Sequence, residues 1–275
     1  VQELHVLSGD IRDPFFTARA AKDCDIVFHL AALIPIPYSY LSPAEFVETN
    51  IRGTLNMLEA CRRNTVGRMI HTSTSETYGT ARYTPIDEKH PLQGQSPYAA
   101  SKIGADKLVE SYWCSFETPV VTLRPFNTYG PRQSARAFLP AVIIQALAGK
   151  VIRVGSLDPV RDMNYVEDTV DGFVRAGVSP GVEGLTLNLG SGRGTTMRDL
   201  LNIALAATGV EARVETDPVR VRPGRSEVLE LICDASLARE KLDWSNRYSV
   251  ENGVERTVDW LRNHLEDYRP DAYAV

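Results

Sequence analysis

Short, largely apolar runs alternate with long helical patterns in the first half of the chain, and this alternation restricts the fold more than any other feature. Residues 4–7, 26–30, 69–72 and 120–124 are such runs, and none shows the polar alternation of a half-exposed strand. Uninterrupted apolar runs of this length are typical of strands that are buried on both faces of a sheet.

The segments between these runs predict helices. Residues 43–63 and residues 97–116 both repeat apolar side chains with the period of an α-helix. Strands that alternate with helices of this length predict βαβ units and therefore a parallel sheet. We predict an α/β fold, a Rossmann-like doubly wound parallel sheet over residues 1–150. In sheets of this kind, ligands bind at the carboxyl ends of the strands.

The second half of the chain is less regular. We expect residues 151–275 to form mostly a smaller α/β cap over the carboxyl edge of the sheet, with some segments returning to the sheet. Residues 184–189 resemble a strand, and helical patterns occur at residues 138–147, 166–177, 196–208, 234–242 and 250–265.

Composition excludes several classes of function. With 43% hydrophobic and 24% charged residues, the chain has the balance of a globular protein. A net charge of −5 gives no basic surface for nucleic acid, and no apolar run approaches the roughly 18 residues of a membrane span. The scattered cysteines and histidines show no metal-ligand spacing, so we expect no metal and a reducing, cytoplasmic location.

The strongest chemical signal is Tyr98 followed by Lys102 near the start of a predicted helix. Residues four apart lie on one face of a helix. A tyrosine with a reference pKa near 10 is a poor base at neutral pH, but a neighbouring ammonium group lowers the phenol pKa. Such a tyrosine can take the proton of an alcohol while a hydride leaves the same carbon.

Three predicted strands end in polar or small residues, which should meet at one edge of the sheet. Residues 69–72 lead into a Ser-Thr-Ser-Glu run that ends at Glu76. Residues 120–124 lead into Pro125 and Asn127, and residues 26–30 lead into two alanines. The small alanines would let a flat cofactor approach the backbone.

Five motifs follow one another along the chain: His29-Leu30-Ala31-Ala32, Ser73-Thr74-Ser75-Glu76-x-Tyr78-Gly79, Ser96-Pro97-Tyr98-x-x-Ser101-Lys102, Arg124-Pro125-x-Asn127-x-Tyr129-Gly130-Pro131 and Arg161-Asp162-x-x-Tyr165-Val166-x-Asp168. In this order they resemble the extended short-chain dehydrogenases/reductases that act on nucleotide sugars, and the resemblance covers nearly the whole chain. The Thr-Ser-Glu triplet is similar to that of NAD-dependent nucleotide-sugar 4,6-dehydratases. The stretch 72–136 looks most like the dehydratases of legionaminic acid biosynthesis, which act on a nucleotide-linked N-acetylglucosamine.

The resemblance implies catalytic roles for the conversion of UDP- or GDP-N-acetylglucosamine to its 4-keto-6-deoxy form. Thr74 would orient the C4 hydroxyl, Tyr98 would take its proton, and Lys102 would be the electrostatic partner of Tyr98. Glu76 would remove the C5 proton and carry a proton to the departing C6 hydroxyl. Some relatives have Asp where this chain has Ser75, and serine is a poor general acid.

The sequence is also compatible with three other functions. Nucleotide-sugar decarboxylases that act on glucuronic acid also carry a Ser-Glu pair here, but they usually have Asp-Glu-Gly between the catalytic Tyr and Lys, where this chain has Ala99-Ala100-Ser101. A 4-epimerase needs the hydroxyl, Tyr and Lys but no C5 base. The third alternative is a protein that binds sugar nucleotides and catalyses no reaction.

Substrate contacts are also implied by the resemblance. Planar guanidinium groups match phosphate in bidentate fashion, so the cap should supply arginines to a diphosphate. Arg161 and Arg222 stand where the family has its diphosphate-contacting arginines, and Arg132 is a weaker candidate. Asn127 and Asn188 match polar residues on the substrate side, in addition to Thr74 and Glu76.

The family holds NAD through a Gly-x-x-Gly-x-x-Gly turn after the first strand, and this chain contains no such stretch. We therefore expect the chain to begin near the third strand of the family's sheet, with the first two strands, a helix and the glycine turn, about 40–60 residues, absent. The remaining NAD contacts implied are Asp10, Ile11, Leu30, Ala31, Ala32, Thr72, Tyr98, Lys102, Pro125 and Asn127.

The resemblance also implies that the protein forms a homodimer. In this family, the helices corresponding to residues 43–63 and 97–116 pack with a second subunit as a four-helix bundle. We expect Leu108, Tyr112 and Trp113 to be exposed apolar residues at that interface.

Overall fold

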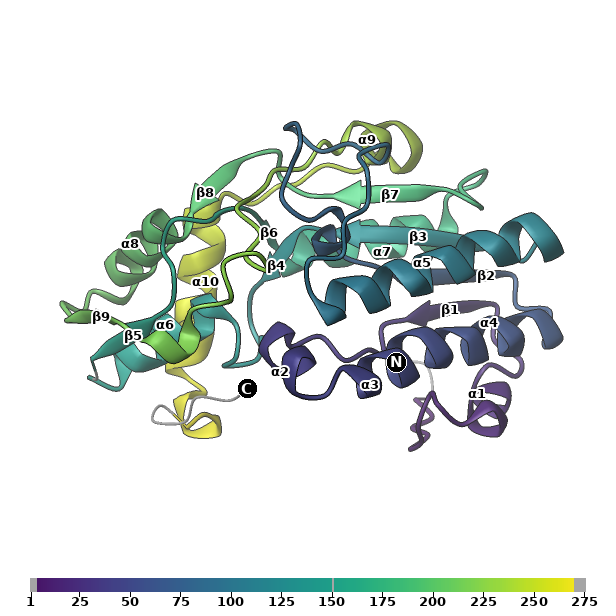
Figure 1. Cartoon of the computed structure of the whole chain (residues 1–275), viewed down its shortest axis with the longest axis horizontal. Coiled ribbons are helices and arrows are strands. Elements are labelled where there is room, and N and C mark those ends of the chain that lie inside the picture. Colours follow the sequence, from purple (N-terminus) through teal and green to yellow (C-terminus); the bar gives the residue numbers. More distant parts are fainter. Residues whose placement is uncertain (1–3, 150, 270–275) are drawn as a thin grey trace.

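A four-stranded parallel sheet forms the centre of the larger part of the molecule (Figure 1). The computed structural model describes residues 4–149 and 151–269, so residue 150, the expected boundary, lies outside the described residues. The strand order is β1-β2-β3-β7, and β3 is buried along almost its whole length. The strands are β1 Ile26–His29, β2 Arg68–Thr72, β3 Val120–Pro125 and β7 Thr186–Leu189. The parallel sheet and three of the four predicted apolar strands are confirmed.

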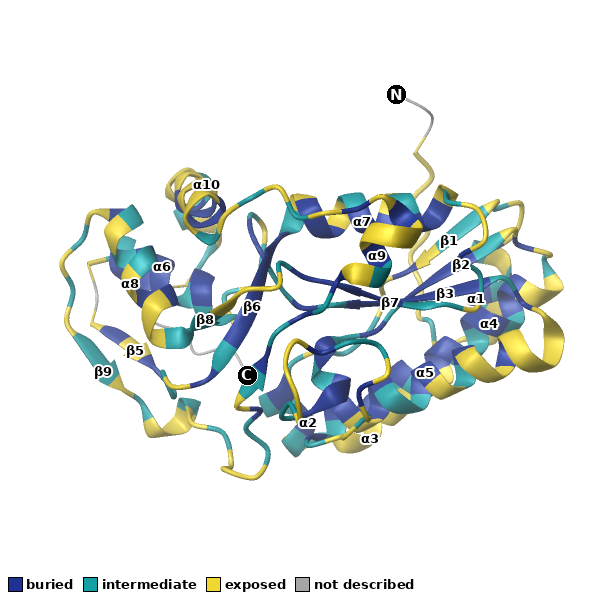
Figure 2. Ribbon diagram, turned by 90° about the horizontal axis from the view of Figure 1, so that it is seen from above, coloured by how far each residue is buried: buried dark blue, intermediate teal, exposed yellow. Residues whose placement is uncertain are grey.

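Helices cover both faces of this sheet, as in a doubly wound fold (Figure 2). On one face lie α4 Gly53–Arg63 and α5 Pro97–Phe116, and on the other lie α7 Val166–Val178 and α9 Ser236–Leu242. The predicted bounds of α5 are confirmed, because Ser96 caps its first turn and Pro97 occupies its first position.

The expected strand at residues 4–7 is wrong. These residues form no regular element, and Leu4 and Val6 are 83% and 82% exposed. A strand needs a hydrogen-bonding neighbour, and residues 4–7 pair with no strand in the described part of the chain. The next element is α1 Pro14–Ala20, which Asp13 caps and which packs against α4.

The helix expected over residues 43–63 is divided into three parts. It begins as α3 Pro43–Phe46, widens into the π-helical turn Val47–Arg52, and continues as α4. Asn50 in the wide turn accepts a hydrogen bond from the backbone of Leu33 and donates one back to it, at 2.8 and 2.9 Å. The π-turn therefore anchors the loop that follows β1, in keeping with the frequent occurrence of such turns near functional sites.

The smaller part of the molecule has its own apolar core, to the left in Figure 1. Strand β6 Val160–Tyr165 pairs with β4 Asn127–Tyr129, β10 Glu230–Leu231 and β8 Gly194–Thr196, and β5 Ile152–Val154 pairs with β9 Val214–Thr216. The core is closed by α6 Phe138–Leu147, α8 Met197–Thr208 and α10 Val250–Arg262. Helix α6 packs here although it precedes residue 150. The short helix α2 Ile36–Leu41 lies between the two parts (Figure 1).

The expected dimer face is only partly exposed. Tyr112 is buried in the chain's own core, and its hydroxyl donates a hydrogen bond of 2.7 Å to Glu59. Leu108 packs against the same core, whereas Trp113 is 37% exposed. Tyr112 and Leu108 therefore do not have the exposure we expected, and the homodimer stays a prediction. Among the described helices, none combines the length and apolar character needed to cross a membrane.

Candidate active site

The candidate site is a cavity of about 310 Å³ between the carboxyl ends of the sheet strands and the cap. Four of the expected site residues line it: Glu76, Asn127, Arg161 and Arg222. It also contains Glu227, which the sequence analysis did not single out. The cavity thus brings together a carboxylate from the end of β2, an amide from the end of β3 and arginines from the cap.

Thr74 shapes the turn that carries Glu76. The Thr74 hydroxyl caps the short 3-10 helix Ser75–Tyr78 and accepts a hydrogen bond of 3.2 Å from the Glu76 backbone N–H. This turn buries Ser75 and leaves Glu76 at the cavity. It ends at Gly79, whose φ of +66° places it in the left-handed region that favours glycine.

Tyr98 lies buried at the start of α5, beside Phe46 and hydrogen-bonded to the Thr74 side chain. Burial raises the pKa of this phenol, and the nearby carboxylates of Glu76 and Asp106 raise it further. We expected the Lys102 charge to lower the Tyr98 pKa, but in this structure burial raises that pKa and the Thr74 side chain, not Lys102, is the group that lowers it.

Lys102 points to the end of β2. Its Nζ donates a hydrogen bond of 2.6 Å to the carbonyl of Thr72, and only 4% of the residue is exposed. Burial lowers the pKa of Lys102 to about 8, because a charged ammonium is costly away from water. Its charge is therefore sensitive to groups that approach it at neutral pH.

Asp106, one helical turn after Lys102, is the main residue that sequence reasoning missed. Its carboxylate accepts hydrogen bonds from Ser73 at 2.8 Å and Arg124 at 2.9 Å, and pairs with His71 Nε2 at 3.1 Å. Burial alone would raise its pKa, but these partners hold the pKa of Asp106 at about 2. Asp106 thereby ties α5 to the ends of β2 and β3.

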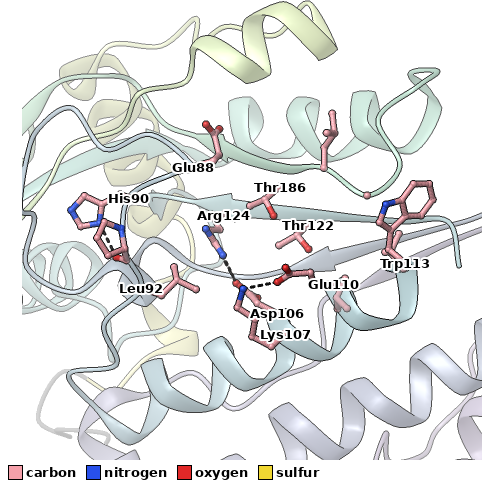
Figure 3. Close-up of a pocket in the computed structure, with 15 residues that line it drawn as sticks. Glu88, His90, Leu92, Asp106, Lys107, Glu110, Trp113, Thr122, Arg124 and Thr186 are labelled. Atoms are coloured by element: carbon pink, nitrogen blue, oxygen red, sulfur yellow. Dashed lines mark hydrogen bonds and ion pairs between the residues drawn. The ribbon is translucent and has the colours of Figure 1, made fainter. Parts of the chain in front are cut away.

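Figure 3 shows Arg124 directed at Asp106 beside a second cavity of about 420 Å³, between α5 and strands β3 and β7. A signal for Asp106 was present in the sequence, because a carboxylate four residues after Lys102 falls on the buried face of α5. Buried carboxylates are almost always paired, so this position could have been predicted to have a basic partner.

Asn188 belongs to this buried network and does not line the 310 Å³ cavity. It is fully buried in β7, where its amide oxygen accepts from the Tyr78 hydroxyl at 2.7 Å and its amide nitrogen donates to the Ile86 carbonyl at 3.1 Å. Tyr78 in turn accepts from Arg124 at 3.1 Å. The expected substrate contact of Asn188 is therefore not supported, because its amide is engaged inside the sheet.

The cap contributes a group of arginines. Arg161 Nη2 and Arg222 Nη1 both approach Glu227 Oε1, at 3.3 and 3.4 Å. Burial lowers the pKa of Arg161, which is only 5% exposed. The cavity is also lined by three arginines that sequence reasoning missed: Arg136, Arg153 and Arg220. Their separate positions in the sequence gave no sign that they would meet.

Arg132 does not reach the cavity. It is exposed, with a φ of +67°, and its neighbours Gln133 and Arg136 line the cavity in its place. The expected substrate contact of Arg132 is therefore not supported by its position.

The expected cofactor contacts lie along the strand ends. Leu30 and Ala31 are exposed and Ala32 is half-buried directly after β1, and Pro125 is half-buried at the end of β3. The Thr72 hydroxyl oxygen and the Asn127 amide oxygen are buried and make no hydrogen bond within the described residues. Such unpaired polar atoms beside small side chains fit a polar cofactor.

Asp10 and Ile11 lie further along the same edge. Asp10 is exposed and forms an ion pair of 2.7 Å with Arg12, and Ile11 packs closely against Gly53. In residues 4–149 and 151–269, no group of three or more His, Cys, Asp or Glu side chains is placed to hold a metal ion.

Comparison with known proteins gives the family. The family model described as GDP-mannose 4,6 dehydratase matches residues 1–257. The dTDP-glucose 4,6-dehydratase of Streptomyces antibioticus is 34% identical over 265 residues, 95% of this chain and 77% of that protein. The UDP-glucose 4-epimerase of Mycolicibacterium smegmatis is 33% identical over 263 residues, 94% and 82% of the two chains.

Solved structures of similar proteins support the same family. A dTDP-glucose 4,6-dehydratase from Streptomyces venezuelae, solved with NAD, has a TM-score of 0.89 at 30% identity, covering 95% of this chain and 80% of that one. The UDP-glucose 4-epimerase of Thermus thermophilus, also with NAD, has a TM-score of 0.85 at 29% identity, with 92% and 83% covered. The chain therefore belongs to the GDP-mannose 4,6-dehydratase family of extended short-chain dehydrogenases/reductases, the NAD-dependent enzymes that modify nucleotide sugars.

Proposed function

We propose that this protein is a nucleotide-sugar 4,6-dehydratase that converts UDP- or GDP-N-acetylglucosamine to the 4-keto-6-deoxy sugar. The observation that carries the proposal is Glu76, a carboxylate at the cavity beside the Thr74–Tyr98 pair. Dehydration needs a base for the C5 proton in addition to the base for the C4 hydroxyl, whereas epimerisation needs only the second.

The cofactor is NAD, and the residues present fit it. Thr72 and Asn127 offer unpaired buried oxygens, and Leu30 and Ala31 offer an open surface at the end of β1. When bound there, NAD would accept the C4 hydride and return a hydride to C6.

The oxidation step uses groups at the ends of β2 and α5. Thr74 orients the C4 hydroxyl, and Tyr98, already hydrogen-bonded to Thr74, takes its proton. In this proposal Lys102, one helical turn further along α5, supplies the positive charge for the phenolate that Tyr98 must reach. Burial raises the pKa of Tyr98 in the structure, and the Thr74 side chain lowers it. This step would be shared with a 4-epimerase.

The elimination step depends on Glu76 alone. Ser75 is only 3% exposed and is turned into the protein, so it offers no acid to the cavity. Glu76 removes the C5 proton and gives a proton to the C6 hydroxyl, which leaves as water. When the hydride returns to C6, C5 regains a proton, which balances the one that Tyr98 took from the C4 hydroxyl. Overall the sugar loses one water, with no net change of oxidation state.

A product analysis by NMR tests the proposal. The protein is incubated with NAD and, separately, UDP- and GDP-N-acetylglucosamine. We expect a 4-keto-6-deoxy product with no accumulation of NADH. A C4 epimer would favour a 4-epimerase, the activity of the Mycolicibacterium smegmatis relative, and would contradict the dehydratase.

The Glu76→Gln variant separates the two steps. We expect it to stop water loss and still allow oxidation at C4, seen as NADH absorbance. Glu110→Gln is the matched control, because Glu110 is an exposed carboxylate on α5 that pairs with Lys107. Full dehydratase activity in Glu76→Gln would show that another group is the C5 base.

A further inference from the structure

Ser226 joins the cap loop 221–229 to two segments that lie outside the cap. It follows four residues after Arg222, which lines the active-site cavity. The Ser226 hydroxyl donates a hydrogen bond of 2.7 Å to the backbone carbonyl of Gln95 and lies 2.7 Å from the hydroxyl of Tyr40 on α2. One serine side chain therefore holds this loop against both α2 and the segment that precedes α5.

The order of donors and acceptors in this link follows from the single proton of a serine hydroxyl. Ser226 gives its proton to the Gln95 carbonyl, which can only accept. The proton between Ser226 and Tyr40 must therefore come from Tyr40. All three residues are half-buried, so their hydrogen bonds are partly shielded from water. Removing the Ser226 hydroxyl breaks two hydrogen bonds, whereas removing the Tyr40 hydroxyl breaks one.

Gln95 connects this link to the helix that carries Tyr98. Its side-chain Nε2 donates a hydrogen bond of 3.1 Å to the Arg225 carbonyl, and its Oε1 accepts one from the Thr80 backbone N–H. Gln95 directly precedes Ser96, the residue that caps α5. The cap loop is thus attached next to the start of the helix that supplies the proposed base.

A hydrogen-bonded turn connects Ser226 with Arg222. The backbone N–H of Ser226 donates to the Pro223 carbonyl at 2.8 Å. Residues 223–225 in this turn are exposed, whereas Val228, two residues after Ser226, is buried in the core of the larger part of the molecule. Ser226 is therefore the point at which the exposed turn meets the rest of the protein, and a shift of Ser226 would move Arg222.

We propose that Tyr40, Ser226 and Gln95 form a hydrogen-bonded link that positions the cap loop relative to the start of α5, and so sets how tightly a nucleotide sugar is held. The inference rests on the proposed function, because it assumes that the diphosphate meets Arg222 while the sugar meets Tyr98. None of the three linking residues lines the cavity, so they act through the loop and are positioning residues. A loop that is already in place loses less conformational entropy when substrate binds.

Ser226→Ala tests the link, because it breaks both hydrogen bonds of the hydroxyl. Kinetics with the nucleotide sugar that the wild type converts, and calorimetry with the corresponding nucleoside diphosphate, give the two readouts. We expect KM to rise and nucleotide affinity to fall, each about tenfold. We expect kcat to change by less than about twofold, because the groups for proton transfer stay in place. Ser226→Thr keeps a hydroxyl and should bind the nucleotide nearly as tightly as the wild type.

A double-mutant cycle shows whether Tyr40 acts through Ser226. Tyr40→Phe alone should weaken nucleotide binding about threefold, because it removes one neutral hydrogen bond. When Tyr40→Phe is combined with Ser226→Ala, we expect no loss beyond that of Ser226→Ala, because the shared bond is already broken. Tyr83→Phe is the matched control, since the Tyr83 hydroxyl donates a bond of equal length, 2.7 Å, to Asp87 outside the cavity. It should bind the nucleotide like the wild type.

The outcomes separate this inference from the proposed function, once thermal unfolding has shown that each variant is folded. If the wild-type protein neither binds a nucleoside diphosphate nor converts a nucleotide sugar, the proposed function is contradicted and the inference with it. If the wild type is active and Ser226→Ala keeps its KM and nucleotide affinity, or loses kcat instead, the inference alone is wrong. It is equally wrong if the losses in Tyr40→Phe and Ser226→Ala add in full.

Discussion

The two walls of the active-site cavity hold their charged groups in different ways. On the sheet wall, Asp106 lies behind the cavity lining, at the second cavity, and is buried with three partners at 2.8, 2.9 and 3.1 Å, all on regular elements or directly after them. On the cap wall, Arg161 and Arg222 share one oxygen of Glu227 at 3.3 and 3.4 Å, and Arg222 and Glu227 lie in a loop. The sheet wall is therefore held by short contacts between regular elements, whereas the cap wall is held by longer contacts to a loop.

This difference in how the charged groups are held fits the different roles proposed for the two walls. Proton and hydride transfer fail when groups are misplaced by a fraction of an ångström, so their supports should be rigid. Phosphate binding tolerates more adjustment, because its strength comes from charge and from several equivalent oxygens. Variants on the sheet wall should therefore change kcat or stability, and variants on the cap wall should change nucleotide affinity.

The largest effect should come from Tyr98→Phe. We expect kcat to fall by about 10²–10⁴, the range for loss of a general base, with little change in nucleotide affinity. Tyr112→Phe on the same helix is the control, because the Tyr112 hydroxyl donates to Glu59, away from the cavity. Steady-state kinetics and calorimetry measure the two quantities, and weaker nucleotide binding in Tyr98→Phe would show that the walls do not act separately.

Next in size is the effect of Asp106→Asn on stability. Removing this charge leaves the buried Arg124 without its carboxylate, and we expect the free energy of unfolding to fall by about 3–5 kcal/mol. Asp10→Asn is the contrast, because the exposed Asp10–Arg12 pair is screened by solvent and should contribute far less to stability. Denaturant unfolding measures both, and equal losses would contradict the special role of the buried pair.

A moderate effect is expected for Arg222→Gln on the cap wall. Loss of one charge-assisted contact to phosphate should weaken nucleotide binding about tenfold, with kcat nearly unchanged at saturating substrate. Arg213→Gln, an exposed arginine outside the cavity, is the control. A large fall in kcat with unchanged nucleotide affinity would show that Arg222 takes part in the reaction itself. It would contradict the division between a sheet wall that sets kcat and a cap wall that sets affinity.

The smallest effect concerns pH. The Lys102 charge, with its pKa lowered to about 8 by burial, is present at lower pH and is lost as the pH rises through that value. We expect kcat/KM to fall above about pH 8, since a neutral Lys102 no longer stabilises the Tyr98 phenolate. In Lys102→Arg, which stays charged, this fall should disappear; if it persists, another group is responsible.

The sequence predicted the sheet wall better than the cap wall. Helix α5 and strands β2 and β3 were identified because local signals, the Ser96 cap and wholly apolar runs, agree with their burial. Residues 4–7 carry the same apolar signal but pair with no strand in the described chain, which no local pattern reports. Pairing depends on the rest of the fold.

Long-range contacts explain the other differences between the residues expected at the site and those found there. Asn188 was expected on the substrate side, and only the fold shows that its amide is bonded to Tyr78. The helical spacing places Asp106 on a buried face, but only the fold shows that its partner is Arg124. Likewise, Arg136 and Arg153 meet in the cavity only because α6 and β5 pack in the cap. Their side chains are placed by tertiary packing, and a sequence pattern contains no record of it.

The short turn that carries Glu76 has a consequence for how new activities arise on this fold. The turn is capped by Thr74, and Glu76 faces the cavity without belonging to the Asp106 network behind it. In the proposed mechanism, a mutation at position 76 would therefore change what happens after the sugar is oxidised and leave the groups for oxidation intact. The proposed chemistry thus divides into a first step shared with epimerases and a second step set by one side chain, which would let relatives diverge in product.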